Sequence, residues 1–311
     1  MDYKDLRIIF MGTPEFAVAS LDILVKNGCH IVGIITAPDK PSGRGMKMTE
    51  SPVKKYAVEH NLHILQPEKL KNPDFLEQLK NLQADLQIVV AFRMLPEAVW
   101  NMPPMGTVNV HGSLLPAYRG AAPINWAVIN GEKQTGVTTF KLQHEIDTGN
   151  ILLQQTIDIR KDETAGELHD EMKEVGAQLL FKTVQGLADA SLQETPQLTI
   201  TNNQSSIPHA PKIFTETCHI DWNKTADEIY NLILGLSPYP AAFTYLQNKM
   251  LKIYSSTKEY SEDDTENGAY KTDGKTFLKF RCSNGFIHVT DIQLEGKKRM
   301  KIEDFLRGYR L

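Results

Sequence analysis

Long apolar runs and paired cysteines are both absent from this sequence of 311 residues. No stretch reaches the roughly 18 apolar residues that a membrane-spanning helix needs, so we expect no membrane partner. The three cysteines, Cys29, Cys218 and Cys282, are far apart and lack the spacing of zinc ligands. We therefore expect free thiols in a reducing cytoplasm and no metal site. The charged N-terminus, MDYKD, leads directly into a strand-like run, so we expect no signal peptide.

Two motifs with well-known functions are incomplete. The turn Gly12-Thr13-Pro14-Glu15 has one glycine where a dinucleotide site needs G-x-G-x-x-G, and Pro14 and Glu15 stand where a phosphate would lie. This disfavours a nicotinamide-dependent dehydrogenase. The tripeptide D-T-G at 147–149 occurs once, whereas an aspartic protease needs two carboxylates that share a proton. We therefore reject the protease class as well.

Excess positive charge is also absent, because the net charge is −4 at pH 7. We therefore expect no general nucleic-acid-binding surface and no DNA partner. Basic residues nevertheless form two clusters, and each alone is best interpreted as solvated surface. A polyanionic partner becomes plausible only if the fold brings both clusters to one side. The first comprises Lys40, Arg44, Lys47, Lys54 and Lys55, and the second comprises Lys297, Lys298, Arg299 and Lys301.

What the sequence does contain is a regular alternation of apolar runs and amphipathic segments over its first 190 residues. It predicts βαβ units with right-handed crossovers, hence an α/β fold with a Rossmann-like, mostly parallel sheet and helices on both faces. Residues 135–142 alternate like an edge or antiparallel strand. Thr13 is expected to cap the first helix, with Pro14 at its first position. Strands are expected at 6–11, 31–36, 63–65, 86–92, 107–111 and 151–159, and helices at 15–27, from 52, at 74–82, 124–130 and 165–186.

The composition changes at residues 191–212, which are rich in Thr, Gln, Asn, Ser and Pro and have few apolar residues. This composition is typical of a linker. A helix at 227–236 follows, and then short strands at 242–246, 251–254, 277–281 and 286–291, which suggest a small β-barrel or sandwich. Of the two, we expect an OB-like β-barrel. We therefore expect a catalytic domain at 1–190, a linker at 191–212 and a β-barrel domain at 213–311, since the chain is long for one core.

Two histidine-bearing stretches indicate the chemistry. Side chains alternate along a strand, so Asn109 and His111 in TVNVH project from the same face, where the strand ends in a Gly-Ser turn. A second stretch places Asp147 in a tight turn. Alone, His111 would more often be structural than catalytic. Together, an amide, an imidazole and a carboxylate can polarise a carbonyl, hold negative charge and move a proton, as acyl-type transfer requires.

Five longer segments carry a resemblance that covers essentially the whole chain. HGSLLPAYRGAAPINWAVINGE, which begins at His111, and QHEIDTGNIL, which begins at Gln143, resemble the 10-formyltetrahydrofolate-dependent formyltransferases. FMGTPEFA, TAPDKPSGRGMKMTESPVK and IDWNKTADEIYNLILGLSPYPAAFT, which begin at Phe10, Thr36 and Ile220, are similar to the members of that family that act on methionyl-initiator tRNA.

The resemblance implies a reaction and its participants. The cosubstrate would be 10-formyltetrahydrofolate, the acceptor the α-amino group of methionine on initiator tRNA, and no metal would take part. Asn109 would hydrogen-bond the formyl oxygen, His111 would stabilise the oxyanion, and Asp147 would help to take the proton of the amine. The alternative is a related formyltransferase for a small amine, such as a nucleotide sugar or glycinamide ribonucleotide. An RNA-binding module with a degenerate catalytic domain is a third possibility, which the intact set of three residues disfavours.

The resemblance also implies binding residues. Ser113, Leu114, Leu115 and Pro116 would contact the folate, and Phe92, Met94 and Leu95 would line its pterin side. Residues 37–51 form a longer loop than usual between a strand and a helix. In this loop Arg44 and Lys47 would contact the acceptor end of the tRNA. Lys297, Lys298 and Arg299 would hold the phosphate backbone, which is a salt-sensitive contact.

Overall fold

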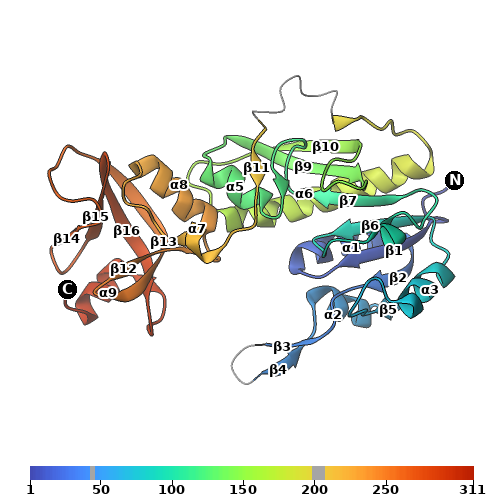
Figure 1. Cartoon of the computed structure of the whole chain (residues 1–311), viewed down its shortest axis with the longest axis horizontal. Helices are drawn as coiled ribbons and strands as arrows, with labels where there is room; N and C mark the ends of the chain where they lie inside the picture. The colour runs from blue at the N-terminus through green and yellow to red at the C-terminus, as the bar shows by residue number, and fades with distance from the viewer. Residues whose placement is uncertain (43–45, 198–206) are drawn as a thin grey trace. The chain divides into compact units, whose positions relative to one another are not determined.

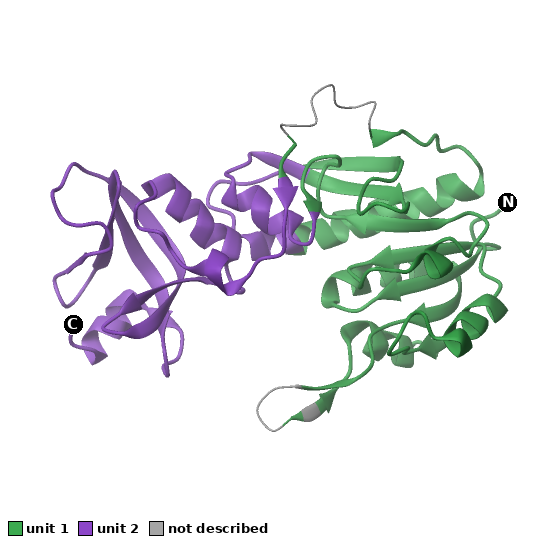
Figure 2. Cartoon of the chain, in the orientation of Figure 1, with its two compact units in different colours: residues 1–119, 136–157, 170–208 green, residues 120–135, 158–169, 209–311 purple. Residues whose placement is uncertain are grey.

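The computed structural model describes residues 1–42, 46–197 and 207–311 (Figure 1). The chain forms two compact units, and Figure 2 shows that each gathers segments from distant parts of the sequence. Unit 1 comprises residues 1–119, 136–157 and 170–208, and unit 2 comprises residues 120–135, 158–169 and 209–311. Unit 2 thus takes up two stretches, 120–135 and 158–169, from the sequence range of the expected catalytic domain.

A seven-stranded sheet in the described chain has the order β10-β9-β7-β6-β1-β2-β5. The neighbours from β7 to β5 pair in parallel, and β9 (Gln134–Lys141) pairs with β7 (Thr107–His111) in the antiparallel sense. The mostly parallel α/β sheet is therefore confirmed, and so is the antiparallel strand expected at 135–142. The remaining strands of the sheet are β1 (Arg7–Gly12), β2 (His30–Ile35), β5 (Ile64–Leu65), β6 (Leu86–Val90) and β10 (Ile151–Asp158).

The central strands are apolar because both of their faces are covered. Every residue of β6 is buried, including Gln87 near its start. On one face, α6 (Ala165–Ala188) comes so close that a Cβ placed on Gly176 would lie 3.3 Å from Val110 and 3.4 Å from Val137. Small size at Gly176 thus permits the close approach of helix and sheet. Further helices and short strands up to residue 218 include α2 (Pro52–Glu59), α3 (Pro73–Asn81), α4 (Glu97–Trp100), β8 (Arg119–Gly120), α5 (Pro123–Ile129), β11 (His209–Ala210) and α7 (Thr215–Cys218).

Two local expectations were wrong. Helix α1 (Glu15–Lys26) has Pro14 and not Thr13 as its N-cap, and no side chain caps it. The extended backbone of Pro14 already presents its carbonyl to Ala17 at 3.0 Å, so the first turn forms without the threonine. The segment 37–51 is also more regular than a loop, because β3 (Lys40–Ser42) and β4 (Lys47–Thr49) pair as antiparallel strands.

Unit 2 contains a six-stranded antiparallel sheet, with the order β12-β13-β16-β15-β14 and β17 paired to β16. Register shifts between Ile253 and Ser256 bend the long strand β13, as β-bulges do, and the sheet curls into a half-barrel. The expected small β-domain is confirmed, but β13 and β16 are longer than predicted. The strands are β12 (Ala242–Leu246), β13 (Lys249–Tyr260), β14 (Tyr270–Thr272), β15 (Leu278–Cys282), β16 (Gly285–Leu294) and β17 (Met300–Lys301).

Two helices close the apolar side of this sheet. Helix α8 (Ala226–Leu236) buries Ile229, Ile233 and Leu236 in the same cluster as Phe280, and α9 (Ile302–Gly308) adds its own apolar residues. Within the described ranges, none of the helices combines the length and the apolar character that crossing a membrane would require.

Helix α8 offers a test of how unit 2 is stabilised. The Thr225 hydroxyl accepts a hydrogen bond from the backbone N–H of Glu228 at 3.2 Å, and the Glu228 carboxylate accepts one from the backbone N–H of Thr225 at 2.9 Å. Replacing Thr225 by Ala removes the first bond and should lower the free energy of unfolding by about 1 kcal/mol. Chemical denaturation measures the change. Thr225→Ser keeps the hydroxyl and serves as control, and equal losses in both variants would contradict the capping role.

Candidate active site

Strand β7 brings Asn109 and His111 to the carboxyl end of the parallel sheet. It pairs with β6 on one side and β9 on the other, with Asn109 opposite Val89 and Phe140. Because side chains alternate, Asn109 and His111 share one face of the strand, as the sequence predicts. The Asn109 side chain is half-buried, and its amide makes no hydrogen bond to the described part of the chain. That amide is therefore available to a ligand.

The imidazole of His111 is buried and held in one orientation. Its Nε2 atom lies 2.9 Å from the backbone oxygen of Tyr118, and the edge of the ring meets the ring of Phe140. A carbonyl oxygen only accepts, so Nε2 carries a hydrogen and donates it. The other ring nitrogen, Nδ1, lies 3.9 Å from the carboxylate Oδ2 of Asp147. Nδ1 is therefore the nitrogen that a reacting group can meet.

Asp147 is placed by the tight turn that joins β9 to β10. Its backbone adopts the left-handed region, with φ 54°. The turn is pressed against the end of β9, since a Cβ on Gly149 would lie 1.6 Å from the backbone oxygen of Lys141. Only glycine fits at that position. Lys141, the last residue of β9, pairs with Val108 near the start of β7, and the segment after it reaches back far enough to bring the Asp147 carboxylate to His111.

The segment after His111 is braced by one threonine that the sequence analysis did not single out. The buried hydroxyl of Thr138 in β9 donates to the backbone oxygen of Ser113 at 2.6 Å and accepts from the backbone N–H of Leu115 at 3.1 Å. Gln154 also donates to the Thr138 oxygen and to the Leu115 carbonyl, both at 2.9 Å. A threonine in a strand gives no sequence signal of such a role, because its partners depend on the pairing of distant segments.

The residues expected to bind folate differ in how much side chain they offer. The Ser113 hydroxyl donates to the backbone oxygen of Ala117 at 2.6 Å, and Leu115 packs on Phe140. Met94, in contrast, is 74% exposed. Most of this set would thus meet a ligand through backbone groups or through one edge of the side chain. Ser113, Leu115, Pro116 and Leu95 are buried, and Leu114 and Phe92 are half-buried.

The residues expected to contact tRNA are also unequal. Arg44 lies outside the described residues, and Lys47 begins β4. Lys297 and Lys298 are exposed in the turn between β16 and β17. Arg299, in contrast, makes a bidentate ion pair with the carboxylate of Asp291 in the same unit.

The Arg299–Asp291 pair is built into the sheet. The guanidinium also lies 4.1 Å from the ring centre of Tyr254, and Lys301 approaches the same carboxylate at 3.5 Å. Burial raises the pKa of Asp291, but the hydrogen bonds and charges of Arg299 and Lys301 outweigh it and hold that pKa below its ordinary value. Arg299 thus has an internal partner, whereas the two neighbouring lysines face solvent.

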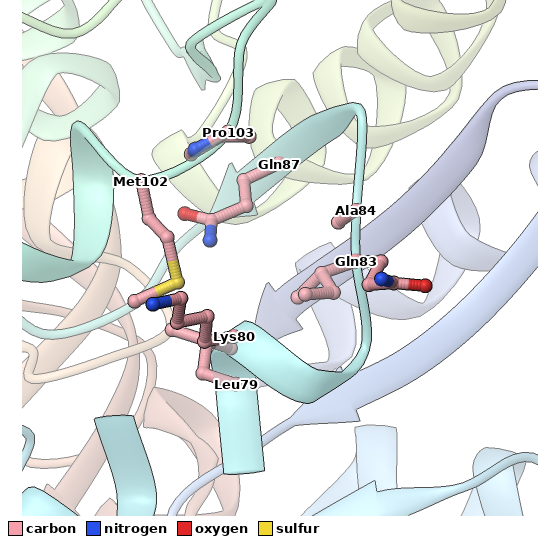
Figure 3. A pocket seen from close by; sticks show the side chains of 8 residues that line it. Leu79, Lys80, Gln83, Ala84, Gln87, Met102 and Pro103 are labelled. Atoms are coloured by element: carbon pink, nitrogen blue, oxygen red, sulfur yellow. The ribbon is translucent and has the colours of Figure 1, made fainter. Parts of the chain in front are cut away.

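Figure 3 shows a pocket in unit 1. It is near the amino ends of β1 and β6, whereas Asn109 and His111 lie at the carboxyl end of β7. Nε2 of the buried Gln87 has no hydrogen-bond partner among the described residues. Over the same residues, no group of three or more His, Cys, Asp or Glu side chains is arranged to hold a metal. The pocket is lined by Ile9, Leu79, Lys80, Gln83, Ala84, Gln87, Met102 and Pro103.

Comparison with known families identifies the chain's relatives. The family model described as formyl transferase matches residues 6–184, and the model of the formyl transferase C-terminal domain matches residues 212–310. The chain belongs to the formyl transferase family. Both matches follow the two parts of the sequence on either side of the polar segment 191–212. The three residues at the end of β7 and in the Asp147 turn fall within the first match.

Curated relatives of this formyl transferase match along the full chain. The protein named methionyl-tRNA formyltransferase in Phocaeicola vulgatus is 54% identical, over 100% of this chain and 98% of the relative. The protein of that name in Bacteroides fragilis is 50% identical, over 100% of this chain and 97% of the relative. The protein of that name in Ruminiclostridium cellulolyticum is 42% identical, over 98% of this chain and 97% of the relative.

Solved structures share the fold of this formyl transferase at low identity. An N-formyltransferase from Helicobacter canadensis, in complex with folinic acid and dTDP-3-aminofucose, has a TM-score of 0.67 at 20% identity, over 95% of this chain and 100% of that one. HypX from Aquifex aeolicus in complex with tetrahydrofolic acid has a TM-score of 0.61 at 17% identity, over 97% of this chain and 48% of that one.

The hydroxyl of Thr138 can be removed with little change of shape by Thr138→Val. The Ser113 carbonyl and the Leu115 N–H then lose a buried partner, so we expect the free energy of unfolding to fall by about 1–3 kcal/mol. Chemical denaturation measures this loss. Thr138→Ser keeps the hydroxyl and removes one methyl group, at a cost of about 0.8 kcal/mol. A valine variant no less stable than the serine variant would show that the hydroxyl does not brace this segment.

Proposed function

We propose that this protein transfers the formyl group of 10-formyltetrahydrofolate to the α-amino group of methionine on initiator tRNA, in the cytoplasm. The observation that carries the proposal is identity of 42–54% over at least 98% of the chain to proteins named methionyl-tRNA formyltransferase. This similarity includes the region of the C-terminal family match. The known structures with bound folates support the choice of donor.

The proposed reaction is acyl transfer through a tetrahedral intermediate. The neutral amine of the methionine attacks the formyl carbon, a C–N bond forms, and the carbonyl electrons move onto oxygen. The intermediate collapses as the bond from carbon to N10 of the folate breaks, and the proton lost by the amine ends on tetrahydrofolate. The amide of Asn109, unpaired within the described chain, donates to the formyl oxygen where negative charge develops.

The geometry of His111 limits what the imidazole can do in this reaction. Nε2 donates a hydrogen bond to the Tyr118 carbonyl, so only Nδ1 remains to interact with the substrate. A neutral ring with hydrogen on Nε2 has a lone pair at Nδ1, and it donates to an oxyanion only after it gains a second proton. The Asp147 carboxylate at 3.9 Å stabilises that charged ring. Asp147 also accepts the proton of the amine, directly or through water.

Binding is assigned to residues around this centre. Phe92, Met94 and Leu95 line the pterin side of the folate, and residues 113–116 contact it. Arg44 and Lys47 contact the acceptor end of the tRNA. Lys297 and Lys298 meet its phosphates, while Arg299, paired with Asp291, holds the turn that carries them.

A direct assay tests the reaction. Purified protein with 10-formyltetrahydrofolate should formylate charged methionyl-initiator tRNA, and Asn109→Ala and His111→Ala should each lower kcat about a hundredfold or more, because each removes a donor to the developing oxyanion. Nucleotide amino sugars and glycinamide ribonucleotide serve as competing acceptors. Formylation of a small amine but not of the charged tRNA would contradict the proposed function. A kcat of His111→Ala close to that of the wild type would contradict the role assigned to the imidazole.

The tRNA contact predicts a salt-dependent effect. Lys298→Ala should raise the KM for methionyl-tRNA severalfold at low salt and reduce the logarithmic salt slope of binding by about 1, with kcat unchanged. Lys275, another exposed lysine of unit 2, provides the matched control, since Lys275→Ala removes the same charge. The same change in both variants would mean that only net charge matters.

A further inference from the structure

A single buried glutamine holds the turn that carries Asp147. Gln197 is 2% exposed, although it lies in the polar segment that follows α6. Its Nε2 donates to the backbone oxygens of Asp147 at 2.9 Å and Gly149 at 2.8 Å. Its Oε1 accepts from Nε and Nη2 of Arg119 at 3.1 and 2.5 Å. All four hydrogen-bonding positions of the amide are therefore used.

The partners also leave no ambiguity in the orientation of this amide. The two backbone oxygens can only accept and the guanidinium can only donate, so nitrogen and oxygen cannot exchange places. Burial of such a group is stable only because each of its hydrogen bonds is made.

The turn needs this support. Asp147 adopts the left-handed region, which costs free energy for a residue other than glycine and persists where the surroundings determine it. Gly149 is in contact with the backbone of Lys141, so the turn has little room to relax. Gln197 satisfies two carbonyls of this turn at once, and it does so from a segment about 50 residues further along the chain.

The same glutamine also reaches the segment that orients His111. Arg119, which bonds Gln197 Oε1, directly follows Tyr118, and the Tyr118 carbonyl accepts from Nε2 of His111. One amide thus joins the backbone that holds the imidazole to the backbone that holds the carboxylate. All of these residues belong to unit 1.

We propose that Gln197 is a positioning residue for the His111–Asp147 pair, acting through Arg119 and through the carbonyls of the Asp147 turn. The inference rests on the proposed formyl transfer for its kinetic readout. Gln197 touches neither reacting group, so its loss should lower kcat and leave both KM values nearly unchanged. A displacement of a catalytic group by about 1 Å can cost up to a hundredfold in rate.

A double-mutant cycle tests this. Gln197→Met keeps the length of the side chain and removes its hydrogen bonds. We expect it to lower kcat about tenfold to a hundredfold in the wild-type background and less than about threefold in an Asp147→Ala background, because coupled residues are not additive. Gln193 is an exposed glutamine in the same segment, so Gln193→Met serves as the control and should leave kcat unchanged. Equal fold losses in both backgrounds, or a loss carried by KM, would overturn the proposal.

A second variant covers the case in which Gln197→Met does not fold. Gln197→Glu keeps an acceptor for Arg119 but cannot donate to the turn when ionised, so it should show the same coupling to Asp147. If the wild type formylates methionyl-tRNA but the losses of kcat caused by the Gln197 and Asp147 substitutions are additive, only the positioning role is rejected. If the wild type is inactive, the proposed function is rejected. In that second case, crystal structures decide: the proposal requires a longer separation between His111 Nδ1 and Asp147 Oδ2 in the Gln197 variants, and an unchanged separation overturns it.

Discussion

The hydrogen bond from His111 Nε2 to the backbone oxygen of Tyr118 determines how the rest of the site can act. A histidine has two nitrogens, and a partner that can only accept assigns the hydrogen to one of them. The free nitrogen, Nδ1, then faces the carboxylate of Asp147. If the Tyr118 carbonyl were turned away, the ring could rotate or exchange tautomers, and neither the Asn109 amide nor the Asp147 turn could compensate for that loss.

The direction of a single strand supports this arrangement. In a fully parallel sheet, the connection after β7 would leave at the carboxyl edge and return at the opposite edge. Strand β9 is antiparallel to β7, so the chain re-enters the sheet at the same edge, and Thr138 pairs with His111 while Lys141 pairs with Val108. From this position the Thr138 hydroxyl braces the segment that follows His111.

How far the sequence predicts these features depends on the distance between the partners. Alternation along one strand is local, which is why the shared face of Asn109 and His111 and the bounds of β12 could be predicted. The length of β13 could not, because its polar half, from Ser255, is held by pairing with β16 and not by its own apolar pattern. Gln197 lies in a stretch whose composition predicts a linker, and its burial depends on Arg119, 78 residues away. Arg299 reads as one of four basic residues in a row of five, and only the fold brings Asp291 against it.

The proposed function assigns the chemistry and the choice of acceptor to different parts of the molecule. Asn109, His111, Asp147 and the groups that hold them all belong to unit 1, and their geometry suits any amine that can reach the formyl carbon. Selection of a tRNA must then come from residues that take no part in the hydrogen bonds of the pair. A substitution at such residues should change the KM for the tRNA and leave kcat unaltered. A substitution in the Gln197 network should instead lower kcat and leave KM unaltered.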